Sequence, residues 1–181
     1  MDMKEIEVKI LEINLAETVR KIEEAGGTKT YEGEVLTTYY DSGKELDRKG
    51  QVLRLRRKDG RTEITFKEKI SQSEISQRDF KSMNEIETTV GDYQTMDTIL
   101  QAIGYKPYRK LNKRRTSYSI IDIRGNVHFD IDTYTGFPTF LEIEAESEVV
   151  VRDWVLRLGH TMKDAKPWTT SDVFKHYGKK M

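Results

Sequence analysis

The stretch EIEVKI at residues 5–10 alternates strictly between charged and apolar side chains. A strand places successive side chains on opposite faces, so Glu5, Glu7 and Lys9 share one face and three aliphatic side chains share the other. The two carboxylates lie about 7 Å apart along such a face, and they form a candidate site for a hard cation, which prefers oxygen ligands. The stretch therefore predicts a strand with an apolar face for a core and a charged face for binding.

The composition describes one charge-rich domain. The 181 residues are 34% charged and 36% hydrophobic, and 31 basic side chains balance 31 acidic ones. A net charge of zero gives no global field that would attract nucleic acid or a membrane. The absence of cysteine excludes a disulfide framework and a thiolate nucleophile. Without a run of 18 apolar residues or a signal-peptide core, we expect a single cytoplasmic domain over 1–181.

Alternation of this kind recurs along the chain and predicts eight strands. The expected strands span 4–12, 34–40, 52–58, 61–69, 82–90, 115–123, 126–133 and 140–146. Helices are expected at 15–25, 94–103, 148–158 and 171–177, each followed by a glycine. The tripeptide EIE occurs three times, each time before a helix, which suggests a sheet built from similar units with helices outside.

The same parity gathers like charges on strand faces. The basic side chains are Arg54, Arg56, Lys67, Lys113 and Arg115, and the acidic pairs beyond the first strand are Glu85/Glu87, Asp130/Asp132 and Glu142/Glu144. In a one-sided sheet, each polar face would simply meet water. If the sheet instead curls, the charged faces meet in its interior, where an unpaired charge is costly. Such an interior must stay wet or hold an ionic ligand.

A polyphosphate chain with a divalent metal would suit both sets of side chains. Arginine offers paired donors to phosphate, and lysine offers a compact positive charge. The carboxylates suit Mg²⁺ or Mn²⁺, because these hard ions prefer oxygen. The sequence has no G-x-x-x-x-G-K-[ST] loop, so phosphate binding would depend on side chains rather than on a helix N-terminus.

Short charged motifs follow one another along nearly the whole chain. They are Glu5-x-Glu7-x-Lys9, Tyr39-Tyr40-Asp41, Arg54-x-Arg56, Thr65-Phe66-Lys67, Glu85, Lys113-x-Arg115-x-x-Tyr118, Asp132 with Gly136, and Leu141-Glu142-Ile143-Glu144. In this order they resemble the CYTH, or triphosphate tunnel metalloenzyme, superfamily. That group includes class IV adenylyl cyclases and thiamine, inorganic and RNA triphosphatases. One departure is Met83, which stands where the R-x-E element of the family usually carries arginine.

The resemblance implies an α+β fold, an eight-stranded antiparallel barrel that forms a tunnel, with helices packed outside. It implies a metal set, a phosphate clamp and one further lining residue. The metal set is Glu5, Glu7, Asp132, Glu142 and Glu144; the clamp is Arg54, Arg56, Lys67, Lys113 and Arg115; the further lining residue is Glu85. Lys9 would shape or polarise the reacting end, so that Lys9, Glu5 and Glu7 form the catalytic group.

Three functions are compatible with such a tunnel. The favoured one is a triphosphatase that uses Mg²⁺ or Mn²⁺ to cleave an inorganic or organic triphosphate. The second is a class IV adenylyl cyclase that converts ATP to cAMP and pyrophosphate, and the third is a protein that binds triphosphate without turnover. The substrate, the metal, the general base and the choice between monomer and homodimer stay open. A small-molecule triphosphate is the expected partner, whereas nucleic acid and membranes are not expected.

Overall fold

A computed structural model describes residues 3–69 and 80–179 of the chain, and the rest of the predicted domain 1–181 lies outside these ranges. The strands are β1 (Met3–Ile10), β2 (Thr28–Asp41), β3 (Gln51–Lys58), β4 (Arg61–Lys69), β5 (Lys81–Val90), β6 (Lys106–Asp122), β7 (Gly125–Thr133), β8 (Phe140–Ala145) and β9 (Ala165–Lys166). The helices are α1 (Leu15–Glu24), α2 (Glu45–Arg48), α3 (Tyr93–Ala102), α4 (Glu148–Arg157) and α5 (Thr170–His176). No helix of this described part is long and apolar enough to span a membrane.

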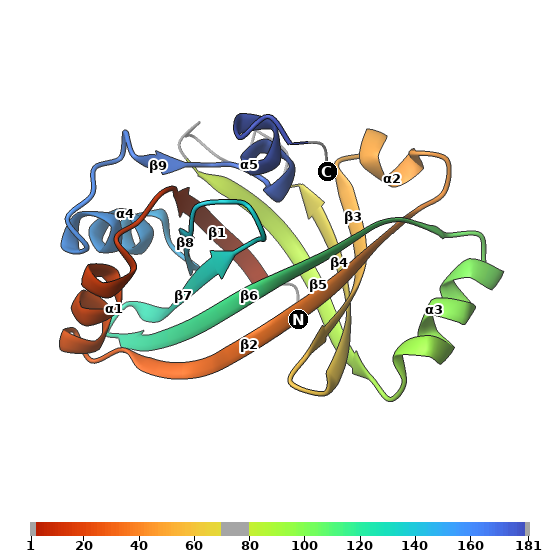
Figure 1. The fold of residues 1–181 in the computed structure, drawn as a ribbon, viewed down its shortest axis with the longest axis horizontal. Helices are drawn as coiled ribbons and strands as arrows, with labels where there is room; N and C mark the ends of the chain where they lie inside the picture. The colour runs from red at the N-terminus through yellow and green to blue at the C-terminus, as the bar shows by residue number, and fades with distance from the viewer. Residues whose placement is uncertain (1–2, 70–79, 180–181) are drawn as a thin grey trace.

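Eight strands form a closed antiparallel barrel, as the sequence predicts. Their order is β5-β4-β3-β2-β6-β7-β8-β1, and β1 returns to pair with β5, which closes the ring. The short β9 pairs with the C-terminal end of β1, at Lys9 and Ile10, as an added ninth strand. Helices α1 and α4 lie together on one side of the barrel, and α3 lies on the opposite side (Figure 1). The α+β tunnel architecture with helices outside is therefore confirmed.

The apolar faces of the strands point outward to the helices. Ile6 and Val8 of β1 belong to the largest buried cluster, together with Ile22 of α1 and Trp154 of α4. A second cluster joins Leu100 of α3 to the apolar faces of β2 and β3. Because the helices take up the apolar faces, the alternating charged faces are left to line the inside of the barrel.

A third cluster fixes α5 near the ends of two barrel strands. Val173 and Phe174 of α5 pack with Tyr134, which follows β7, and with Phe140, which begins β8. The rings of Tyr134 and Phe174 meet edge to face with centroids 5.1 Å apart, a favourable aromatic geometry. Thr169 caps this helix with a full capping box, and the helix starts at Thr170, one residue before the predicted start at residue 171.

The strands β2 and β6 are longer than the sequence predicts. They contain 14 and 17 residues and pair with each other from Thr28 to Asp41. Residues 28–33 carry polar or small side chains on both faces, so alternation of hydrophobicity gives no signal there. At the start of α1, Asn14 accepts a hydrogen bond from the backbone N–H of Glu17, while the Glu17 carboxylate pairs with Lys21 at 2.8 Å.

Candidate active site in the barrel interior

The three strands that carry EIE lie side by side, in the order β5-β1-β8. Strand register puts Glu7 opposite Glu144 and Lys9 opposite Glu142, and it puts Glu5 opposite Met83. Side chains at directly opposite positions share a face. The barrel closure therefore collects on one inner wall the charged faces of strands that are far apart in the sequence.

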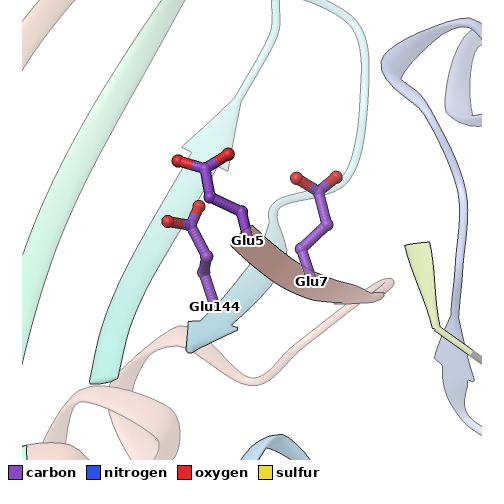
Figure 2. A group of neighbouring side chains, drawn as sticks. All are labelled: Glu5, Glu7 and Glu144. Carbon is purple, nitrogen blue, oxygen red and sulfur yellow. The ribbon is translucent and has the colours of Figure 1, made fainter. Parts of the chain in front are cut away.

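Three carboxylates on this wall form a group that could hold a metal ion. Glu5 and Glu7 come from β1 and Glu144 comes from β8, and each offers an oxygen within 4.8 Å of the others. All three carboxylates project to the same side of their strands (Figure 2). Carboxylate oxygens at such spacing match the donor chemistry of Mg²⁺ and Mn²⁺, so the residues present fit the metal that the resemblance implies.

The protonation of this group is strongly perturbed. Burial raises the pKa of Glu144 well above its ordinary value, and the neighbouring Glu5 raises it further. Burial, with a hydrogen bond to Glu85, raises the pKa of Glu5 to about 7. Within residues 3–69 and 80–179, Glu144 has no ion-pair partner. Lys67 lowers the pKa of Glu144 but does not reverse the rise, so this enclosed carboxylate beside two others is a favourable position for a positive ligand.

Lysines hold the other two members of the group. Lys67 donates to Glu5 at 2.6 Å, and both Lys9 and Lys81 lie 2.7 Å from the same Oε1 atom of Glu7. Burial opposes ionisation of Glu7, but the ammonium groups of Lys9, Lys81 and Lys67 together outweigh burial and lower the pKa of Glu7. Lys9 also lies 2.7 Å from Glu142, so it links β1 to β8.

Sequence reasoning did not identify Lys81. The predicted strand began at residue 82, so Lys81 fell outside the alternating segment, although it has the same parity as Met83 and Glu85. The structure starts β5 at Lys81 and pairs it in register with Glu7. Extending the predicted strand by one residue would have found it.

Glu85 lies among the phosphate-clamp residues as a lining carboxylate. It forms a close ion pair with Lys67 and a 3.3 Å contact with Arg54. Burial opposes ionisation of Glu85, but a hydrogen bond from Glu5 and the charges of Lys67 and Arg54 lower its pKa to about 2. Glu5 and Glu85 thus flank Lys67 on both sides.

Asp132 and Glu142, the two remaining members of the predicted metal set, are held by cations. Asp132 accepts two 2.6 Å hydrogen bonds from the guanidinium of Arg115 and one of 2.6 Å from Lys113. Glu142 is held by Lys9. Neither carboxylate belongs to the group of three, so the structure brings Glu5, Glu7 and Glu144 together and leaves these two in ion pairs.

Within the described ranges, Arg56 is the clamp residue that has no ion pair, although the charge of Glu87 acts on it. Its Nε atom is enclosed and has no hydrogen-bond acceptor, and no carboxylate of the described ranges pairs with its guanidinium. Burial lowers the pKa of Arg56, and the like charges of Arg54 and Arg115 lower it further. Burial likewise lowers the pKa of Lys113 to about 8, with Arg115 as the next cause. An anion between these side chains would supply the acceptor that Arg56 Nε lacks and would reduce the repulsion among the cations.

The interior can therefore bind a cation and an anion side by side. Among the residues that the structure describes, Glu144 is the member of the three-carboxylate group without an ion pair, and Arg56 is the clamp cation without one. Lys67 and Arg54 already donate hydrogen bonds to carboxylates, Lys67 to Glu5 and Arg54 to Glu85. An anionic ligand that carries its own metal ion would satisfy both ends.

Solved structures with this fold span almost the whole chain. A protein from Pyrococcus horikoshii OT3 has a TM-score of 0.74 and 25% sequence identity, covering 93% of this chain and 98% of that chain. A structure from Vibrio parahaemolyticus, described as a candidate adenylate cyclase, has a TM-score of 0.78 and 15% identity, with coverages of 97% and 99%.

A third neighbour is a Hippeastrum protein, whose description gives it as a candidate adenylyl cyclase with a dominant triphosphatase activity. It has a TM-score of 0.63 and 15% identity, covering 98% of this chain and 97% of that chain. No curated protein matches the sequence at a significant level. The family model of the CYTH domain matches residues 3–162, nearly the whole length, and the chain therefore belongs to the CYTH domain family.

Proposed function

We propose that this CYTH protein is a triphosphatase that hydrolyses a triphosphate-bearing substrate inside the barrel with the help of Mg²⁺ or Mn²⁺. The observation that carries the proposal is the pair of unmatched charges in the interior. Within the described ranges, no cation forms an ion pair with Glu144 and the Nε atom of Arg56 has no acceptor. In contrast, a cation holds each of the other carboxylates of the predicted metal set, which are Glu5, Glu7, Asp132 and Glu142. A triphosphate with a bound divalent ion would bring positive charge to Glu144 and negative charge to Arg56.

The metal ligands would be Glu5, Glu7 and Glu144. Asp132 and Glu142, which the family resemblance adds, would join them only by releasing the cations that now hold them. A divalent ion bound there would neutralise phosphate oxygens and polarise the bond that breaks. The protein's own contribution is to keep three carboxylates converging from two adjacent strands.

The phosphate chain would be held by side chains from three strands of the barrel. These are Arg54 and Arg56 of β3, Lys67 of β4, and Lys113 and Arg115 of β6. Asp132 fixes the guanidinium plane of Arg115 through two parallel hydrogen bonds, so this donor is oriented before any ligand arrives. Fixed cations around the leaving group stabilise the charge that develops on it as the P–O bond breaks.

The reaction is hydrolysis at a phosphorus of the triphosphate. A water oxygen forms the new bond to the terminal phosphorus, the bridging P–O bond breaks, and the products are orthophosphate and a diphosphate leaving group. Lys9 is enclosed between Glu7 and Glu142, and these carboxylates outweigh the effect of burial and raise its pKa. It therefore stays protonated and acts by holding these carboxylates, not as a general base.

The test is a turnover panel with tripolyphosphate, thiamine triphosphate and ATP, each with Mg²⁺ and with Mn²⁺, that measures phosphate, pyrophosphate and cAMP separately. We expect orthophosphate release from at least one triphosphate and no cAMP from ATP. The description of the Hippeastrum neighbour, which gives that protein a dominant triphosphatase activity, supports the choice of hydrolysis. Pyrophosphate together with cAMP would favour the cyclase, and binding without any product would favour a non-catalytic binder.

A further inference from the structure

Two ammonium groups meet on one oxygen of Glu7. Lys9 and Lys81 both place Nζ 2.7 Å from Oε1, but their surroundings differ. Lys9 has a second carboxylate, Glu142, at 2.7 Å, whereas Lys81 has no other ion-pair partner in the part of the chain that the structure describes. One carboxylate therefore serves two cations, and Lys81 is the one that depends on it alone.

Lys81 is also the most accessible of the ion-paired lysines in the interior. Its side chain is 19% exposed, compared with 3% for Lys9 and 10% for both Lys67 and Lys113. It stands at the first residue of β5, next to the inner positions Met83 and Glu85 on the same face. Met83 is apolar and buried, so Lys81 is the cation that β5 contributes to this wall.

A metal ion at the three-carboxylate group would change the partner of Lys81. Glu7 is one of those three carboxylates, and its charge cannot neutralise a divalent ion and two ammonium groups together. Lys9 keeps Glu142 in that state, whereas Lys81 is left as a reachable cation beside the bound metal. A lysine ammonium is a strong donor to phosphate oxygen, and its flexible stem lets it move to a new acceptor.

We infer that Lys81 is a further substrate-positioning residue, which binds a phosphate oxygen of the triphosphate once Glu7 is committed to the metal. This inference rests on the proposed function. The inference gives β5 a phosphate contact at Lys81, two residues before Met83 on the same inner face and about 7 Å from it along the strand. The alternative role for Lys81 is purely structural, as a fixed counter-charge that keeps Glu7 ionised.

The test compares Lys81→Met with Lys29→Met, which removes the lysine of an exposed ion pair on β2, Lys29–Glu32, outside the interior. The Michaelis constant for tripolyphosphate is measured at saturating Mg²⁺, and Mg²⁺ affinity is measured without substrate by calorimetry. We expect K81M to raise KM about tenfold or more, with a smaller change in kcat. K29M should match the wild type, and Lys81→Arg should recover KM to within about threefold, since the charge is retained.

Metal affinity separates the two roles. Since the ammonium competes with the ion for Glu7, we expect K81M to bind Mg²⁺ at least as tightly as the wild type. An unchanged KM together with weaker Mg²⁺ binding in K81M would overturn the inference and assign Lys81 to the structural role. Lys81→Gln keeps a hydrogen-bond donor for Glu7 and removes the positive charge, so we expect it to raise KM in the same way. This second variant tests the inference even if the K81M protein fails to fold.

Failure of the proposed function gives a different result. If the wild type hydrolyses none of the triphosphates, the triphosphatase proposal fails, and Lys81 is then tested by calorimetric binding of tripolyphosphate with Mg²⁺. A loss of about tenfold in affinity for K81M, with none for K29M, would support the phosphate contact even in a non-catalytic protein. Equal affinities of K81M and the wild type would refute it.

Discussion

Replacing Arg56 by methionine should make the protein more stable and less active at the same time. Arg56 is an enclosed guanidinium with an Nε atom that has no acceptor, and it lies beside the like charges of Arg54 and Arg115. Methionine keeps much of the apolar stem and removes the charge. The substitution therefore removes an unsatisfied group from the ligand-free protein, and it removes a phosphate donor from the proposed complex.

The size of the stabilisation follows from the missing hydrogen bond. A buried donor without an acceptor costs about 1–3 kcal/mol, and relief of the repulsion adds to this. A gain of about 2 kcal/mol in the free energy of unfolding corresponds to a rise of about 4–8 °C in Tm for a domain of this size. Loss of one charged phosphate contact should lower kcat/KM for tripolyphosphate by at least tenfold.

Arg115→Met is the matched control, because it removes a guanidinium of the same interior that does have partners. Arg115 binds Asp132 through two hydrogen bonds and forms a close ion pair with Asp130. Its loss leaves enclosed carboxylates without a partner, so we expect R115M to be destabilised by about 3–5 kcal/mol. Thermal and urea unfolding in the presence of a chelator measure the free energy of unfolding of both variants. If R56M lost as much stability as R115M, the conclusion that Arg56 is an unsatisfied cation in the ligand-free protein would be refuted.

Three further results are expected. Glu144→Gln should leave the unfolding free energy within about 0.5 kcal/mol of the wild type in chelator, because Glu144 has a raised pKa and no ion pair within the described part of the chain. The metal-dependent activity of this variant should fall about a hundredfold or more, and near-normal turnover would remove Glu144 from the metal site. Mg²⁺ affinity should rise between pH 6 and pH 8, because the ion must displace the proton of Glu5, whose pKa is about 7. Below that pKa the rise should reach up to about tenfold per pH unit. Calorimetry at several pH values measures the affinity, and a flat profile would contradict a role for Glu5 as a metal ligand. Trp154→Ala should cost about 3–5 kcal/mol in urea unfolding, because the ring is buried against Phe129, while KM of the folded fraction stays unchanged.

Much of this fold could be predicted from alternation alone. Every predicted strand exists, and β4 has the predicted bounds, because hydrophobic and charged side chains alternate clearly where one face meets helices and the other lines the interior. Alternation failed where both faces of a strand are polar, as at residues 28–33 of β2. It also gave no sign of α2 or β9, which have only four and two residues and carry no periodic pattern of their own.

The candidate site was predictable as a set of residues but not as a set of contacts. Parity places Glu7 and Glu144 on charged faces, yet only the closing of the barrel makes β1 and β8 neighbours. For the same reason, no local pattern shows that Lys67 bridges Glu5 and Glu85 or that Lys9 links Glu7 to Glu142. These contacts join residues from different strands, and they depend on strand order and register rather than on neighbouring sequence.

The position of β1 at the closure of the barrel has a consequence for folding kinetics. Its partners β5 and β8 lie far from it in the sequence, since Glu5 pairs opposite Met83 and Glu7 opposite Glu144. Contacts between such distant residues require costly loop closure and slow the search for the native state. Because the carboxylates of β1 meet Glu144 only when the ring shuts, the ability to capture a divalent ion should appear in the last step of refolding, together with full cooperativity.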